Sequence, residues 1–129
     1  MASRVTHFEI YGDEPASLAD FYSNLFGWRL ERAEGIDYWR IHLDPSDNGS
    51  VGGGLTYRPA FNAPGWIHFI NVESLDDSLV VAQRLGAKVL RPKTAVPRTA
   101  WCAVLADPEG NVFAIWQPDP MAFPPPEPD

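Results

Sequence analysis

The sequence predicts an α+β fold made of two βαβββ modules, because one pattern occurs twice along the chain. The stretches "VTHFEIYGDEPASLADFYSNLFGW" and "WIHFINVESLDDSLVVAQRLGA" each place a histidine in an apolar strand. Each strand precedes an amphipathic helix that ends at a glycine. The spacing between His7 and His68 nearly equals the spacing between Gly27 and Gly86. Similarity at a fixed period indicates an internal repeat.

The first module is expected over residues 4–58. Alternation of apolar and polar residues predicts a strand over 4–11, with Phe8 on one face and His7 on the other. A helix follows over 15–25, with Pro15 in its first turn and Gly27 after its end. Its predicted buried stripe is Leu18, Phe21, Tyr22 and Leu25. Three more strands are expected over 28–32, 38–43 and 52–57, the last two separated by the turn sequence "DPSDNGS".

The second module is expected over residues 66–118 and repeats this order. A strand over 67–72 leads to a helix over 75–85, with Ser74 as N-cap and Gly86 after its end. Its predicted buried stripe is Leu75, Leu79, Ala82 and Leu85. Strands over 88–90, 101–105 and 112–117 follow, with "DPEGN" as the last turn and a loop over 91–99. Residues 1–118 therefore form one domain, and the proline-rich acidic tail 119–129 is expected not to pack.

Composition excludes several classes of partner. The formal charge of −7 over 129 residues disfavours nucleic acid and anionic membranes, whose phosphates would be repelled. No apolar stretch approaches the roughly 20 residues that span a bilayer, and the first residues lack the apolar core of a signal peptide. The single Cys102 lies in an apolar run and is expected to be a buried thiol. A cytoplasmic protein is the simplest expectation.

The repeated βαβββ unit, its strand-borne histidines, the "FY…FGW" helix end and the late "DPEGN" together resemble the vicinal oxygen chelate superfamily. That superfamily includes glyoxalase I, extradiol dioxygenases and the bleomycin resistance proteins. The resemblance covers residues 5–118 and implies a glyoxalase-like fold in which curled mixed sheets enclose a cavity. In chains of this size, it also implies a homodimer whose second subunit completes each pocket.

The resemblance also implies four metal ligands, and only two of the four positions hold one here. His7 and His68 match the histidine positions, but Gly54 and Ala114 stand where carboxylates are expected. Two imidazoles alone are a poor site for a divalent ion, since catalytic zinc usually keeps three protein ligands. Glu9 shares a strand face with His7 and could serve as a substitute ligand or a catalytic base. The alternative is that Glu9 forms an ion pair with Arg29, Arg40 or another cation.

The same alternation predicts a ligand pocket with an aromatic lining. Tyr11, Thr56 and Trp116 are expected to face it, together with the two histidines; Trp66 and Trp101 could wall its opening or belong to the core. His42 shares a face with Tyr38 and Arg40, so it is either a ligand contact or a hydrogen-bonding group at a strand end. The glycines at 52–54 are expected to form a flexible strand entry with room for a ligand.

Three functions remain open at this point. The first is a small-molecule-binding protein of the vicinal oxygen chelate type, with no cofactor and a degraded metal site. The second is a divalent-metal-dependent lyase or a dioxygenase-like enzyme that uses His7, His68 and Glu9. The third is an interaction or accessory module without a ligand.

Overall fold

A computed structural model describes residues 3–42, 52–59 and 64–124 of the chain. The chain divides into two compact units, one over residues 6–68 and one over residues 1–5 and 69–129. We call them the N-terminal and the C-terminal module. The predicted "DPSDNGS" turn lies outside the described residues. No helix among the described residues is long and apolar enough to cross a membrane.

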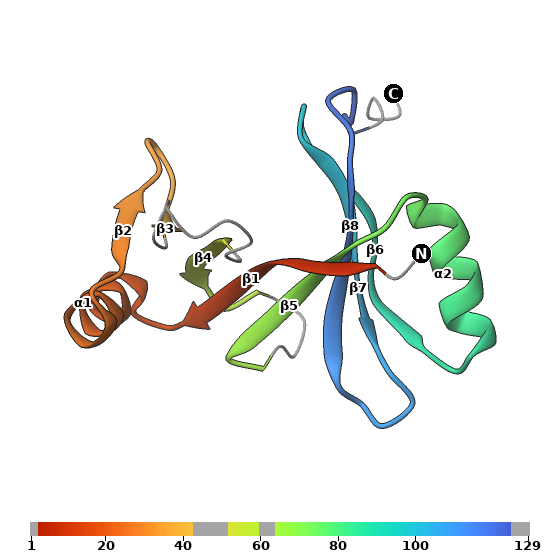
Figure 1. Ribbon diagram of the computed structural model, residues 1–129, viewed down its shortest axis with the longest axis horizontal. Helices are drawn as coiled ribbons and strands as arrows, with labels where there is room; N and C mark the ends of the chain where they lie inside the picture. Colours follow the sequence, from red (N-terminus) through yellow and green to blue (C-terminus); the bar gives the residue numbers. More distant parts are fainter. Residues whose placement is uncertain (1–2, 43–51, 60–63, 125–129) are drawn as a thin grey trace, which may run out of the picture. The chain divides into compact units, whose positions relative to one another are not determined.

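The N-terminal module has the predicted βαβββ order (Figure 1). Its elements are β1 (Arg4–Gly12), α1 (Pro15–Phe26), β2 (Arg29–Arg32), β3 (Tyr38–His42) and β4 (Gly52–Tyr57). The strands are arranged β2-β3-β4-β1. Strand β1 runs parallel to β4, whereas the β2–β3 and β3–β4 pairs are antiparallel. The sheet is therefore mixed, as the glyoxalase-like fold requires.

Local sequence signals explain where α1 begins and ends. Pro15 occupies the first turn, where its missing N–H costs no hydrogen bond. Gly27 ends the helix with φ of 72°, and its N–H donates to the carbonyl oxygen of Ser23 at 2.9 Å. The predicted stripe is only half right, because Phe21 and Leu25 are 55% and 57% exposed. Leu18 and Tyr22 carry the contact with the core, while Phe21 and Leu25 lie outside it.

The core of the N-terminal module lies between α1 and one face of its sheet. Buried Phe8, Ile10, Ile41 and Leu55 form its centre. Five partly buried side chains pack around them: Leu18, Tyr22, Trp28, Leu30 and Trp39. The predicted alternation of β1 is confirmed, since its even-numbered residues from Phe8 on face this core. The odd-numbered residues therefore point to the opposite face of the sheet.

The C-terminal module repeats the topology. Its elements are β5 (Trp66–Asn71), α2 (Leu75–Arg84), β6 (Lys88–Val96), β7 (Ala100–Ala106) and β8 (Val112–Pro118), with strand order β5-β8-β7-β6. The predicted N-cap is confirmed, because the Ser74 hydroxyl accepts a hydrogen bond from the Asp77 N–H at 3.2 Å. Cys102 is buried, as expected.

Two expectations for the C-terminal module are wrong. Leu85 is 72% exposed rather than part of the buried stripe, because α2 ends at Arg84 and the chain turns away. Strand β6 continues through the predicted loop, reaching Val96 instead of Leu90. Register shifts near Arg91 accommodate Pro92, which a strand tolerates at the edge of a sheet.

The start of the proline-rich tail packs against the C-terminal module, contrary to expectation. The Arg98 N–H donates to the Ala122 carbonyl oxygen at 2.8 Å, and the Asp119 N–H donates to that of Thr99 at 2.9 Å. The Trp101 indole N–H also donates to the Asp119 carboxylate at 3.0 Å. Ala122 is fully buried as a result. Composition misses this because specific hydrogen bonds hold the segment.

Strand β4 has glycines because two aromatic rings occupy the space of its missing side chains. A Cβ on Gly53 would lie 2.5 Å from Cζ of Phe8, and one on Gly54 would lie 1.8 Å from the Tyr38 hydroxyl. No described atom lies within 4 Å of the Cβ position at Gly52. The glycines are thus an ordered part of the sheet, paired on both sides, and not a flexible entry at positions 53 and 54.

We therefore expect Gly53→Ala to lower the free energy of unfolding by roughly 1–3 kcal/mol, the usual cost of overpacking a core. Gly52→Ala is the matched control on the same strand, and we expect little change because no described atom lies within 4 Å of its Cβ position. Urea denaturation of both variants measures the difference. Equal stability of the two variants would contradict the packing argument.

Candidate functional site

The sheet face of the N-terminal module that points away from α1 carries most of the predicted site residues; we call it the polar face. Register places them together: His7 pairs with Gly52, Glu9 with Gly54, and Tyr11 with Thr56 between β1 and β4. Strand β3 contributes Tyr38, Arg40 and His42, and β2 contributes Arg29 and Glu31. Paired residues share a face of a sheet, so this set forms one surface.

A hydrogen-bonded cluster around Glu9 lies at the centre of the polar face. The Tyr11 hydroxyl donates to Oε1 of Glu9 at 2.7 Å, and the Tyr38 hydroxyl donates to Oε2 at 3.0 Å. Nε2 of His7 lies 3.7 Å from the same Oε2. The Glu9 side chain is only 18% exposed. A half-buried carboxylate is therefore held in place by groups from two strands.

These contacts determine the ionisation of the cluster. Burial alone would raise the pKa of Glu9, but His7, Tyr11 and Tyr38 outweigh it, so this pKa lies below its ordinary value of 4.5. Burial and the adjacent carboxylate raise the pKa of the Tyr38 hydroxyl well above its ordinary value. Tyr38 thus keeps its proton and donates to an ionised Glu9. A lowered pKa makes Glu9 a weak proton acceptor.

Glu9 pairs with neither Arg29 nor Arg40 among the described residues; the cationic group beside it is the imidazole of His7, at 3.7 Å. Arg29 instead pairs with Glu31 at 2.8 Å. Tyr38 adds a hydrogen bond to Glu9 from β3, although 29 residues separate the two in sequence. Alternation along β3 puts Tyr38 on the correct face. The sequence holds no signal that its ring leans across β4, apart from the glycines over which it passes.

The remaining predicted contacts on this face have partners within the module. Nε2 of His42 lies 3.8 Å from Oε2 of Glu31, and both side chains are exposed. The Thr56 hydroxyl donates to the Asp37 carbonyl oxygen at 2.7 Å, which ties β4 to the turn before β3. Thr56 therefore has a structural partner, whereas His42 stays accessible at the end of β3.

The other predicted site residues belong to β5 and to the C-terminal module. His68 is exposed on β5, between buried Ile67 and Phe69. Trp116 on β8 meets Phe69 edge to face, with ring centroids 6.0 Å apart. Ala114 pairs with Phe69 and Val104 and is fully buried. Ligand contacts by His68 and Trp116 stay predictions.

The donor set does not fit a divalent metal ion. Among the described residues, no three of the His, Cys, Asp and Glu side chains come together in a way that could hold one. The Tyr38 hydroxyl occupies the position that a side chain at Gly54 would take. Both carboxylate oxygens of Glu9 already accept hydrogen bonds from tyrosines. A metal would have to displace these donors and would find two imidazoles at most.

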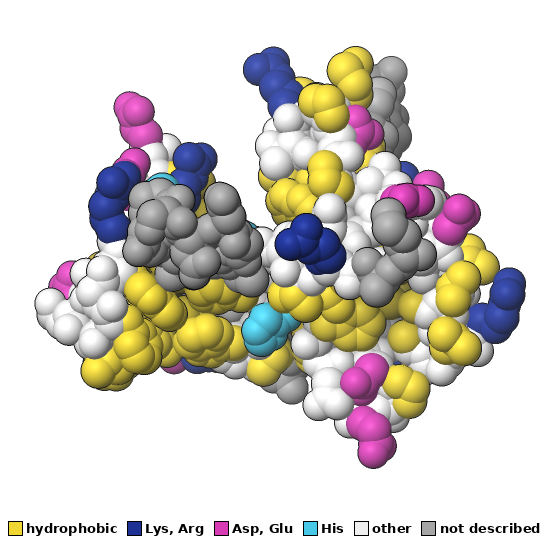
Figure 2. Space-filling view, viewed as in Figure 1, with side chains coloured by type: hydrophobic (Ala, Val, Ile, Leu, Met, Phe, Trp, Pro, Cys, Tyr) yellow, Lys and Arg dark blue, Asp and Glu magenta, His cyan; other side chains and the backbone are white. Residues whose placement is uncertain are grey.

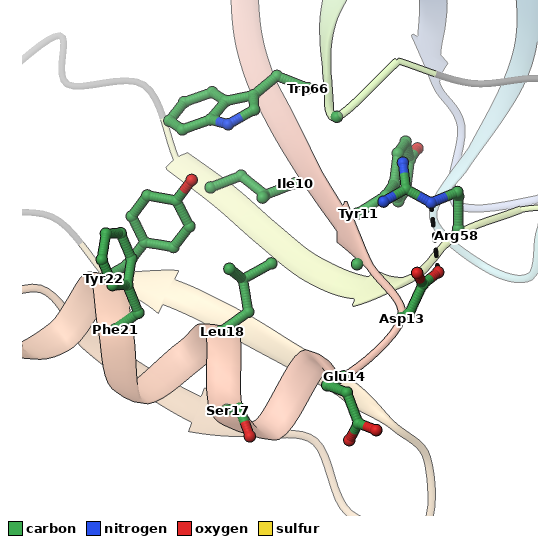
Figure 3. A pocket seen from close by; sticks show the side chains of 12 residues that line it. Ile10, Tyr11, Asp13, Glu14, Ser17, Leu18, Phe21, Tyr22, Arg58 and Trp66 are labelled. Atoms are coloured by element: carbon green, nitrogen blue, oxygen red, sulfur yellow. Dashed lines mark hydrogen bonds and ion pairs between the residues drawn. The ribbon is translucent and has the colours of Figure 1, made fainter.

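Trp66 belongs to the helix side of the module and not to the polar face. Its ring stacks on Phe8 at 5.4 Å and meets Tyr22 edge to face at 5.9 Å. Together with Ile10 and Leu18 it borders a hollow of about 450 Å³ next to α1 (Figure 3). Arg58 and Asp13 form an ion pair of 3.4 Å at one end of this hollow.

Comparison with known proteins identifies the family. The glyoxalase-like domain family matches residues 8–116. The chain belongs to this family. It is also 26% identical over 117 residues to CFP32, a proposed glyoxylase of Mycobacterium tuberculosis and Mycobacterium bovis. The match covers 88% of this chain but only 43% of CFP32, so the chain spans less than half the length of these relatives.

Solved structures agree on the fold. A glyoxalase/bleomycin resistance protein/dioxygenase superfamily member from Vibrio splendidus matches with a TM-score of 0.62 at 16% identity, covering 92% of this chain and all of the other. A variant of methylmalonyl-CoA epimerase from Streptomyces coelicolor matches with a TM-score of 0.62 at 15% identity, covering 96% and 100%. These structures show the fold, and the match to the glyoxalase-like domain family places the chain in the vicinal oxygen chelate superfamily.

The Glu9 cluster makes stability depend on pH in a defined direction. Because the pKa of Glu9 is lowered on folding, its stabilisation is complete above pH 4.5 and is lost as the pH falls below that value. We expect Tyr38→Phe to lower the free energy of unfolding at pH 7 by about 1–3 kcal/mol, the value of a hydrogen bond to a charged group. The difference in free energy of unfolding between wild type and Tyr38→Phe should shrink on acidification, because a hydrogen bond to a protonated Glu9 stabilises the fold less than one to its carboxylate.

Urea denaturation at pH 7 and below pH 4 measures this change. Tyr57→Phe is the control, since Tyr57 is an exposed tyrosine on β4 of the same sheet. A deficit in Tyr38→Phe that is independent of pH would show that the hydroxyl does not act through the Glu9 carboxylate.

Proposed function

We propose that this glyoxalase-like chain binds a small organic molecule at the polar face and does so without a resident divalent metal. The observation that carries the proposal is the Glu9 cluster. Both carboxylate oxygens of Glu9 accept hydrogen bonds from tyrosine hydroxyls, whereas a metal ligand would keep an oxygen available for the ion. A fixed set of donors and acceptors beside an open glycine is suited to orienting a polar ligand. Membership of the superfamily supports small-molecule recognition as the role of such a face.

The cluster supports binding better than proton abstraction. Glu9 is ionised but already accepts hydrogen bonds from two tyrosines, so it has little capacity to take up a proton from a substrate. His7 lies at the rim of the cluster and is 28% exposed in its side chain. It is the group best placed to meet a ligand, while Glu9 fixes the orientation of the imidazole and of both hydroxyls.

We expect small polar aromatic compounds, such as benzamide, benzyl alcohol and benzoate, to shift the backbone amide NMR signals of β1, β3 and β4 selectively. We further expect the purified protein to contain well under one equivalent of zinc, nickel, manganese or iron. Added metal should stabilise wild type no more than it stabilises His7→Ala. His42→Ala is the matched histidine control.

Stoichiometric metal that disappears in His7→Ala but not in His42→Ala would overturn the metal-free proposal and favour the metal-dependent enzyme. Absence of any selective shift on the three strands would instead favour the interaction module.

We also propose that two copies associate through α1. Phe21, Leu25 and Phe26 are each more than half exposed on this helix, and hydrophobic side chains gather over it in Figure 2. Contiguous apolar surface of this kind marks interaction sites. Asp20 is the single charged residue of α1, so two copies of the helix could meet with little repulsion.

We expect the double variant Leu25→Ser/Phe26→Ser to sediment as a monomer at concentrations where wild type is a dimer. Val81→Ser/Leu85→Ser is the control, because it removes comparably exposed apolar groups from α2 and its C-cap. Wild type that sediments as a monomer throughout the micromolar range would contradict the proposal.

A further inference from the structure

Arg40 is distinct among the arginines of the N-terminal module. Arg29 pairs with Glu31, Arg32 pairs with Asp37, and Arg58 pairs with Asp13. Within the described part of the chain, Arg40 forms no ion pair, although its cross-strand neighbour on β2 is Glu31. That glutamate is directed to Arg29 and His42 instead. Arg40 is exposed on the polar face, and its guanidinium carries five N–H donors for a ligand to accept from.

Among the described residues, the glycine segment of β4 lies beside Arg40 on this face. Arg40 pairs with Gly54 and Ile41 with Gly53, so β3 brings Arg40 and His42 alongside the glycine segment of β4. The Tyr38 ring fills the position above Gly54, but no described atom lies within 4 Å of the Cβ position at Gly52. His7 borders Gly52 from the other side, on β1. Nitrogen-bearing side chains of β1 and β3 thus lie on either side of Gly52, a position that no side chain of the described residues fills.

The charges of the polar face select the sign of a ligand. Both of its carboxylates have partners. Glu9 contacts two tyrosines and His7. Glu31 contacts Arg29 and His42. The charge left without a counter-ion on the described face is the positive charge of Arg40. A monoanion would compensate this charge, whereas a dianion would also meet repulsion from Glu9 and Glu31.

We propose that Arg40 binds the carboxylate of a small organic acid, whose body extends over Gly52 toward His7. The planar fork of a guanidinium matches a carboxylate with two parallel hydrogen bonds, which a histidine or a lysine does not offer. The inference rests on the proposed function, since it names the chemical class of ligand that the polar face takes. It makes Arg40 the residue that discriminates acids from neutral compounds.

The test compares acids with their neutral isosteres by NMR titration of the full-length chain. The probes are benzoate against benzamide and phenylacetate against phenylacetamide, with phenyl phosphate as a dianion. We expect the acids to shift the amide signals of Arg40, Gly52 and His7 and to bind at least tenfold more tightly than the amides. Arg40→Gln should weaken acid binding by roughly ten- to a hundredfold, the value of a charged hydrogen-bonded contact, and leave amide binding unchanged.

Two further variants make the outcome specific. Arg40→Lys keeps the charge but loses the fork, so we expect it to recover only part of the affinity for benzoate. Arg32→Gln, an arginine already paired with Asp37, should bind benzoate like wild type. Circular dichroism of each variant verifies that the fold is retained.

Each remaining result counts against the inference in a distinguishable way. If amides and acids shift the same three strands equally, or if Arg40→Gln binds benzoate like wild type, the polar face binds ligands but Arg40 does not select acids. The proposed function would survive that result. If phenyl phosphate binds more tightly than benzoate, the charge argument for a monoanion is wrong. If no probe shifts these signals, the inference fails together with the proposed function.

Discussion

The N-terminal module depends on a strand whose first three residues have no side chains. Strand β4 lies between β1 and β3, and its glycines leave the backbone bare on both faces. Phe8 uses that space on the helix side and becomes the centre of the core. Tyr38 uses it on the other side and reaches across a whole strand to Glu9. The hydrophobic core and the polar cluster therefore depend on two adjacent glycines of one strand, Gly53 on the helix side and Gly54 on the other.

The two modules share a topology but not a chemistry. In both, a parallel pair of strands flanks an antiparallel set, and one helix packs against the sheet. The position that corresponds to Gly54 is Ala114 in the C-terminal module, where it is fully buried next to Phe69. No tyrosine–carboxylate cluster like that of Glu9 is found among the described residues there. The repeat thus conveys the architecture, while the polar groups are concentrated in the N-terminal copy.

Features that depend on local periodicity can be predicted from the sequence, whereas contacts between side chains far apart in the sequence cannot. The caps at Gly27 and Ser74 and the opposed faces of β1 follow from residue type and alternation, and the structure agrees. The exposure of Phe21 and Leu25 depends on how much of the helix the sheet covers, which no local pattern encodes. Packing at Ala122 depends on distant hydrogen bonds. The contact between Tyr38 and Glu9 depends on the length of a ring that crosses a neighbouring strand.

The position of the Tyr38 ring has a consequence for the evolution of this site. A glutamate cannot simply appear at position 54, because its Cβ would collide with the Tyr38 hydroxyl before its carboxylate reached the face. A large side chain at 54 therefore requires the Tyr38 ring to leave its place, which would break its hydrogen bond to Glu9. Within the family, the residues at the positions of Gly54 and Tyr38 should covary. Chains that carry a carboxylate at the position of Gly54 should lack a tyrosine at the position of Tyr38.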